Sequence, residues 1–291
     1  MKFFIYLSGC RVRFSSHTFS SNLRCDTSRR VQSDLHHRFS MAAAAYSSMR
    51  SPPLQLSKTP RFVPQLVVFD LDDCLWSPEM YTLRFEPDTA VAGDLGGGVG
   101  SGAVGATVTT QRRGGAPTVQ LFPGARAVLQ SIWAGELGSN VRCAAASSAD
   151  TPLAVRCAHA SLAILEVVPG VTLLDFFARN HPPAVVASKA HLQIGRSPPL
   201  SSDKTTHFRF LQECTRVKFN MMLFFDDCNW GENCARVERG CKGVVAQKTP
   251  HGLCKEAWAL CLAKFQTQRA REGAKEEEAR SKALAACSPD S

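Results

Sequence analysis

The chain has 291 residues, of which 44% are hydrophobic and 20% charged, and its formal net charge is +9. This composition is ordinary for a globular protein, and the length suits one large domain or two small ones. No apolar run approaches the ~18 residues that a membrane-spanning helix needs. The 12 cysteines contain no CxxC pair and are too sparse for a small disulfide scaffold. We therefore expect reduced thiols and no membrane partner.

Most of the excess charge lies in residues 1–60, which carry +7, whereas the rest of the chain carries +2. A nearly neutral body gives no reason to expect a nucleic-acid partner. Residues 1–60 also hold 12 serines and only two acidic residues, which is typical of an organelle transit peptide. We expect a plastid or mitochondrial location on that basis. Three alternatives remain: a disordered leader, translation from Met41, which gives a cytoplasmic protein, and a secretory signal, for which the apolar stretch before Ser8 is short.

Three further segments have unusual compositions. Residues 93–115 hold nine glycines, including a literal GxGxxG, but no strand pattern precedes it and no acidic residue follows at the spacing of a dinucleotide site. We predict a flexible insertion there, and a second one at 181–203, which contains two proline pairs. Residues 266–291 alternate in charge and are predicted to form a charged, solvated C-terminal tail.

The remaining body, residues 61–265, alternates short apolar runs with segments of helical periodicity. Continuous runs of this length are typical of strands that are buried on both faces of a parallel sheet. The predicted strands are Leu66–Phe69, Val141–Ala146, Val171–Leu174, Met221–Phe225 and Gly243–Ala246. The predicted helices are 123–133, 152–165, 204–217, 232–239 and 251–265. This order predicts an α/β fold with a Rossmann-like open parallel sheet and helices on both faces.

In such a sheet the ligand binds beyond the carboxyl ends of the strands. Asp70 and Asp72 follow the first run, Ser147 ends the second, Asp226 and Asp227 end the fourth, and Lys204 begins a helix. Carboxylates that meet at one sheet edge repel one another unless a cation intervenes or one is protonated. Mg²⁺ accepts hard oxygen ligands together with substrate phosphate, while a hydroxyl and a lysine can hold the remaining phosphate oxygens. The pattern therefore favours phosphoryl chemistry.

Four motifs in this order resemble the haloacid dehalogenase superfamily. They are VVFDLDDCLW at 67–76, AAASSAD at 144–150, Lys204 in DKTTHF, and FFDDCNW at 224–230. The sequence is most similar to the small eukaryotic magnesium-dependent phosphatases, over roughly residues 62–265. The resemblance implies a haloacid dehalogenase-like core with a minimal cap and an aspartyl-phosphate intermediate.

Carried over by position, the resemblance implies that Asp70 is the nucleophile and Asp72 the general acid/base. It implies that Mg²⁺ is held by the Asp70 carboxylate, the Asp72 backbone carbonyl and Asp227. Phosphate or substrate binding falls to Ser147, Ser148, Lys204 and Leu71, with Asp226 and Trp76 in supporting roles. The sequence departs from the pattern at Cys74, where the family has threonine, and at Ser148, where closer relatives have arginine.

We therefore predict a Mg²⁺-dependent phosphomonoesterase that acts on a small phosphorylated substrate or a phosphoprotein, with protein tyrosine phosphatase activity among the possibilities and a monomer favoured. Its substrates would be phosphotyrosine-like groups or sugar phosphates. One alternative is another phosphotransferase of the same superfamily. A second is a catalytically silent binding module on this fold, although none of Asp70, Asp72 and Asp227 is lost.

Overall fold

The computed structural model describes residues 61–109 and 117–286. The predicted leader at 1–60 and the tail beyond residue 286 lie outside the described residues. Among the described helices, none has the length and apolar character to cross a membrane. The nine cysteines of the described segments are free thiols, as the sequence predicts.

A five-stranded parallel sheet forms the centre of the fold, with the strand order β11-β10-β1-β6-β9. The strands are β1 (Leu66–Phe69), β6 (Arg142–Ser147), β9 (Leu192–Ile194), β10 (Met222–Asp226) and β11 (Val245–Lys248). β1 lies in the middle and pairs with both β10 and β6, so the chain order is broken on each side of it. The predicted Rossmann-like α/β fold is confirmed.

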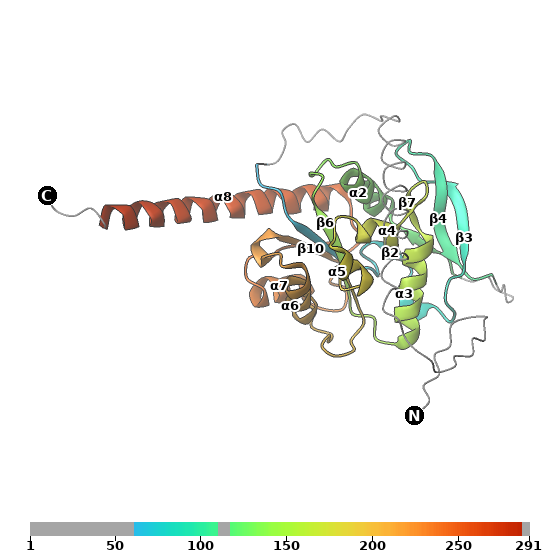
Figure 1. Cartoon of the computed structure of the whole chain (residues 1–291). Coiled ribbons are helices and arrows are strands. Elements are labelled where there is room, and N and C mark those ends of the chain that lie inside the picture. Colours follow the sequence, from blue (N-terminus) through green and yellow to red (C-terminus); the bar gives the residue numbers. More distant parts are fainter. Residues whose placement is uncertain (1–60, 110–116, 287–291) are drawn as a thin grey trace, which may run out of the picture. The chain divides into compact units, whose positions relative to one another are not determined.

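Helices cover both faces of this sheet (Figure 1). They are α2 (Pro123–Trp133), α3 (Pro152–Ile164), α4 (Leu173–Ala178), α5 (Pro183–Ala187), α6 (Lys204–Thr215), α7 (Asn233–Gly240) and α8 (Lys255–Ala286). α8 joins the last predicted helix and the first part of the predicted charged tail into one 32-residue helix. Two short 3-10 helices, at Met80–Thr82 and Phe219–Met221, complete the helical elements described here.

The alternation of side chains along β1 explains how one short strand supports two layers. Leu66 and Val68 point toward the core beneath α6 and α7, where Phe208 packs edge-to-face on Phe224. Phe69, one residue further along, contacts Phe177 of α4 and stacks on Phe225, which in turn contacts Trp258 of α8. All four residues of β1 are fully buried, as a strand covered on both faces requires.

The glycine-rich insertion differs from the prediction, because nine of its 17 described residues, 93–109, lie in paired strands. The rest of the predicted segment, 110–115, lies outside the described residues. β3 (Thr89–Asp94) and β4 (Ser101–Thr107) join β2 (Trp76–Ser77) and β5 (Val119–Leu121) in an antiparallel sheet of order β2-β5-β4-β3. The glycines have two uses. Gly96, Gly97, Gly98 and Gly100 take positive φ angles in the hairpin turn, while a Cβ on Gly102 or Gly105 would collide with neighbouring side chains. These packing requirements come from the tertiary structure, so composition alone suggested a loop.

The predicted irregular segment at 181–203 is also corrected. It contains α5 and the edge strand β9, which pairs in parallel with β6. The predicted strand at 171–174 does not belong to the main sheet. Val171–Thr172 forms β8, which pairs with β7 (Glu166–Val168) in a separate two-stranded sheet, and Leu173 begins α4. A capping box between Thr172 and Asp175 starts that helix. β9 therefore takes the fifth position in the main sheet.

Gly124, in the first turn of α2, packs directly against the chain that leads into α8. A Cβ there would lie 2.6 Å from the carbonyl oxygen of Leu253 and 2.8 Å from the Cα of Cys254. Alanine normally stabilises a helix relative to glycine by about 1 kcal/mol, but here backbone must move. We expect Gly124→Ala to lower the free energy of unfolding by about 1–3 kcal/mol in urea titrations.

The control is Gly273→Ala in α8, where the added Cβ meets no described atom within 4 Å apart from the adjacent residues and the helix's own backbone. This variant should unfold no earlier than the wild type. If Gly124→Ala were as stable as Gly273→Ala, the close approach of α2 and the segment before α8 would be contradicted.

Candidate functional site

Parallel pairing brings three of the predicted site residues to one edge of the sheet. Asp70 follows β1, Ser147 ends β6 and Asp226 ends β10, and β1 lies between the other two strands. The backbone N–H of Asp70 donates to the carbonyl of Phe225 at 2.8 Å, which fixes the two aspartate-bearing ends side by side. Sequence reasoning predicted this meeting of strand ends, and the structure confirms it.

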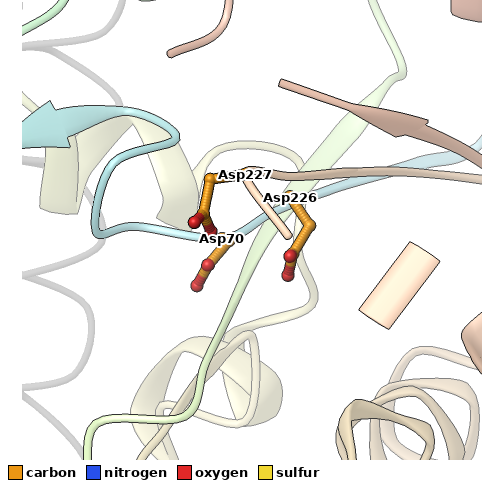
Figure 2. Close-up of side chains that lie close together, drawn as sticks. All are labelled: Asp70, Asp226 and Asp227. Carbon is orange, nitrogen blue, oxygen red and sulfur yellow. The ribbon is translucent and has the colours of Figure 1, made fainter. Parts of the chain in front are cut away.

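Three carboxylates converge at this edge (Figure 2). Oxygen atoms of Asp70, Asp226 and Asp227 all lie within 4.8 Å of one another, and the three residues are 6%, 0% and 6% exposed. Burial raises the pKa of Asp70 well above its usual value; Lys204 opposes this rise, and the charges of Asp226 and Asp227 add to it. Burial together with Asp226 also raises the pKa of Asp227. This cluster is the kind of oxygen-rich, anionic site that a hard divalent cation occupies.

Lys204 is the positive charge inside this cluster. It begins α6, is 2% exposed, and its Nζ lies 2.7 Å from Asp70 and 2.6 Å from Asp226. The Asp203 carboxylate caps the helix by accepting the N–H of Thr205, which sets the direction in which the lysine leaves the helix. Burial alone would lower the pKa of Lys204, but the two carboxylates outweigh burial and raise it. Lys204 is therefore a permanent ammonium.

The structure distinguishes the two adjacent aspartates of the fourth motif. Asp226 accepts hydrogen bonds from Lys204, from the backbone N–H of Cys228 at 2.8 Å and from the Asn233 amide at 3.1 Å. Burial would raise its pKa, but Lys204 and these donors lower it. Asp227 accepts one backbone N–H, from Asn229, and lines the cavity described below, which Asp226 does not. The carboxylate of Asp226 is thus occupied by hydrogen bonds from the protein, whereas Asp227 faces the cavity.

Asp72 is held in a different way from the other carboxylates. One of its oxygens accepts the indole N–H of Trp76 at 2.7 Å, and the other accepts the backbone N–H of Met80 at 3.0 Å. Trp76 is fully buried, so its ring cannot stack on a substrate but can fix the carboxyl group. Burial raises the pKa of Asp72 to about 6, although the two hydrogen bonds oppose this rise. A carboxyl group with such a pKa can both give and take a proton near neutral pH.

A cavity of about 490 Å³ opens over these groups. Of the residues that the sequence pointed to, it is lined by Asp70, Asp72, Ser147, Ser148, Lys204 and Asp227. Ser147 is 3% exposed, and the hydroxyl of Ser148 is buried without a hydrogen-bond partner among the described residues. Leu71 does not line the cavity, and its side chain is fully buried. Any contact between Leu71 and a substrate therefore falls to its backbone.

Cys74, the departure from the family pattern, is also fully buried. Its sulfur accepts a hydrogen bond from the hydroxyl of Thr249 at 3.4 Å, and its carbonyl accepts the N–H of Leu253. Burial raises the pKa of this thiol well above its usual value, so it stays neutral. Cys74 therefore supports the turn after Asp72 and does not line the cavity.

Sequence reasoning missed the residues at the mouth of the cavity. Glu79, Tyr81, Asp150, Arg196, Trp230 and Asn233 also line it, together with Ala149 and Ala154. Tyr81 and Trp230 are 55% and 78% exposed and meet edge-to-face at 6.5 Å between ring centroids. The indole N–H of Trp230 donates to the Glu79 carboxylate at 3.1 Å, which holds the ring at the mouth. Trp230 closes the FFDDCNW segment, so its position beside the fourth motif was the available signal.

Comparison with curated proteins found no match. The profile of the acid phosphatase family, in contrast, matches residues 62–268. The chain belongs to the acid phosphatase family. This membership supports a phosphatase function, and it agrees with the haloacid dehalogenase-like core that the four motifs predicted. The matched range includes every side chain placed around the cavity.

Removal of the Lys204 charge should destabilise the fold strongly. Lys204→Met leaves Asp70 and Asp226 buried without their shared counter-charge, and loss of one partner of a buried pair costs about 3–5 kcal/mol. Thermal unfolding in the presence of a chelator measures this loss. The matched control is Lys248→Met, because Lys248 pairs with Glu232 at 2.7 Å in an exposed ion pair. That control should change stability by about 1 kcal/mol or less; equal effects of the two substitutions would contradict the account.

Proposed function

We propose that this protein is a Mg²⁺-dependent phosphomonoesterase in which Asp70 attacks phosphorus and forms an aspartyl-phosphate. One observation carries the proposal: a buried carboxylate at the floor of a cavity is surrounded by a lysine, further carboxylates and a strand-end hydroxyl. One carboxylate oxygen of Asp70 lies 2.7 Å from the Lys204 ammonium, which neutralises negative charge beside it. This arrangement suits a nucleophile that must approach a phosphoryl group.

The donor set fits a magnesium ion. Three carboxylates and one ammonium leave two negative charges within a buried cluster, which a divalent cation balances. In this proposal the Asp70 and Asp227 carboxylates and the Asp72 backbone carbonyl hold the ion. When bound, Mg²⁺ supplies charge neutralisation to the phosphoryl oxygens. Asp226, which is occupied by Lys204, Cys228 and Asn233, keeps the lysine in place instead of binding the metal.

The chain's own residues then carry the reaction. Lys204 and Ser147 bind phosphoryl oxygens, with Ser148 and the backbone at Leu71 as further contacts. An Asp70 oxygen forms the bond to phosphorus while the bond to the leaving oxygen breaks, and Asp72 donates its proton to that oxygen. In the second half, Asp72 takes a proton from water, whose oxygen attacks phosphorus and releases phosphate and free Asp70. The pKa of about 6 that burial gives Asp72 suits both transfers.

The mouth of the cavity favours one of the two expected substrate classes. Tyr81 and Trp230 present exposed aromatic rings beside Glu79, and such rings bind flat, apolar leaving groups. We therefore place phosphotyrosine-like and other aryl phosphates ahead of sugar phosphates. A small ester or a phosphoprotein can carry this group. A catalytically silent module is disfavoured because a binding site for phosphate alone does not need Asp72 poised by Trp76 and Met80.

Asp70→Asn should abolish turnover of phenyl phosphate, because an amide oxygen is a poor nucleophile toward phosphorus. We expect kcat to fall by about 10³-fold or more. Asp94→Asn, an exposed carboxylate outside the cavity, should match the wild type. Substantial activity in Asp70→Asn, measured by phosphate release from a protein shown to be folded by circular dichroism, would exclude Asp70 as the nucleophile.

Metal removal tests the proposed dependence on Mg²⁺. Activity should disappear with a chelator and return with Mg²⁺, and calorimetry should show one Mg²⁺ bound per chain. Asp227→Asn should weaken that binding by about 10-fold or more, because it removes a charged ligand. Asp150→Asn, at the mouth, should leave it unchanged. Full activity in the presence of chelator would contradict a metal-dependent mechanism.

A further inference from the structure

Arg196 is a cavity residue that lies outside the four motifs. It follows β9, and β9 pairs with β6 so that Ile194 lies beside Ser147. The N–H of Gly195 donates to the carbonyl of Ser147 at 2.9 Å, and the carbonyl of Gly195 is 3.2 Å from the ring of His207. The chain at 195 is therefore tied to the end of β6. Arg196 emerges at the same edge of the sheet as the candidate nucleophile.

The Nε of the Arg196 guanidinium is hydrogen-bonded to the protein, whereas its two Nη groups are available to a ligand. The Nε of Arg196 donates to the carbonyl of Ser148 at 2.9 Å. Neither of its two Nη groups makes a hydrogen bond or an ion pair with any residue in the described part of the chain. The other cation of the cavity, Lys204, already lies between two carboxylates. Arg196 is thus the cavity cation with unused capacity for an anion.

Depth separates Arg196 from the phosphoryl position. Asp70, Ser147 and Lys204 are between 2% and 6% exposed and form the floor, whereas Arg196 is exposed and lies at the mouth with Tyr81 and Trp230. A phosphoryl group seated against Asp70 extends its leaving group outward, past this mouth. What the Arg196 guanidinium meets is therefore the leaving group and not the transferred phosphate.

We propose that Arg196 is a specificity-determining residue that binds an anionic group, a carboxylate in the first instance, on the leaving group of the substrate. This inference rests on the proposed phosphatase function. Guanidinium binds carboxylates through two parallel hydrogen bonds, and the free Nη pair provides them. The other charged side chains that the described residues place at the mouth, Glu79 and Asp150, are acidic and repel such a group, so Arg196 is the residue there that can bind it.

The experiment compares two aryl phosphates, phenyl phosphate and 4-carboxyphenyl phosphate, in the presence of Mg²⁺. For each protein, kcat/KM on 4-carboxyphenyl phosphate is divided by kcat/KM on phenyl phosphate. Differences in leaving-group chemistry then cancel when this ratio is compared between variants. Arg196→Gln should lower this ratio by about 10-fold or more, mainly through KM for the carboxylated ester. Arg196→Lys should fall between it and the wild type, because it keeps the charge but not the paired donors.

Arg209→Gln is the matched control, since Arg209 is exposed on α6 and does not line the cavity. It should leave the ratio unchanged. Equal losses on both esters in Arg196→Gln would overturn the proposal, because Arg196 would then act on the phosphoryl group or on local structure. The absence of any loss on either ester in Arg196→Gln would overturn it as well. Failure of the wild type to hydrolyse phenyl phosphate would instead contradict the proposed function, so the two failures are distinguishable.

Discussion

The shared ion pair of Lys204 with Asp70 and Asp226 is the interaction on which the site depends. It requires β1 and β10 to end side by side and α6 to begin directly beneath them. Helix α6 contributes this lysine from its first residue and also buries Phe208 and Leu211 in the core against β10. The same packing that stabilises the sheet therefore delivers the charge. A shift of one residue in β1 would turn Asp70 away from it.

One lysine does not neutralise three carboxylates, and this imbalance is the functional feature of the cluster. Burial raises the pKa values of Asp70 and Asp227, and at Asp70 the nearby Lys204 only partly offsets this rise. The pKa of Asp226 is lowered instead, because Lys204, Asn233 and the backbone N–H of Cys228 donate hydrogen bonds to it. The fold thus concentrates negative charge where a divalent cation would relieve it. The cluster is arranged for binding and not for stability.

The residues that sequence reasoning predicted are those with strong local signals. Leu66–Phe69 and the run before Asp226 are continuously apolar because they are buried on both faces, and their acidic ends identify the site. β9 has only three residues and contains a glutamine, so its place in the sheet depends on pairing with β6 and not on its own pattern. The β3–β4 hairpin was missed because its glycines are required by cross-strand packing. Arg196 was missed because it follows β9, which the sequence pattern did not identify as a strand.

The central claim is that Asp70 becomes covalently phosphorylated, and mass spectrometry of an acid-quenched reaction tests it most directly. The wild type and Asp72→Asn would be quenched during turnover of 4-nitrophenyl phosphate, an ester whose leaving group departs without an acid. Asp72→Asn slows attack by water, so the intermediate should accumulate. The account predicts one added phosphoryl group on the peptide that contains Asp70. Turnover with no covalent phosphate in either protein, or with phosphate on another residue, would contradict it.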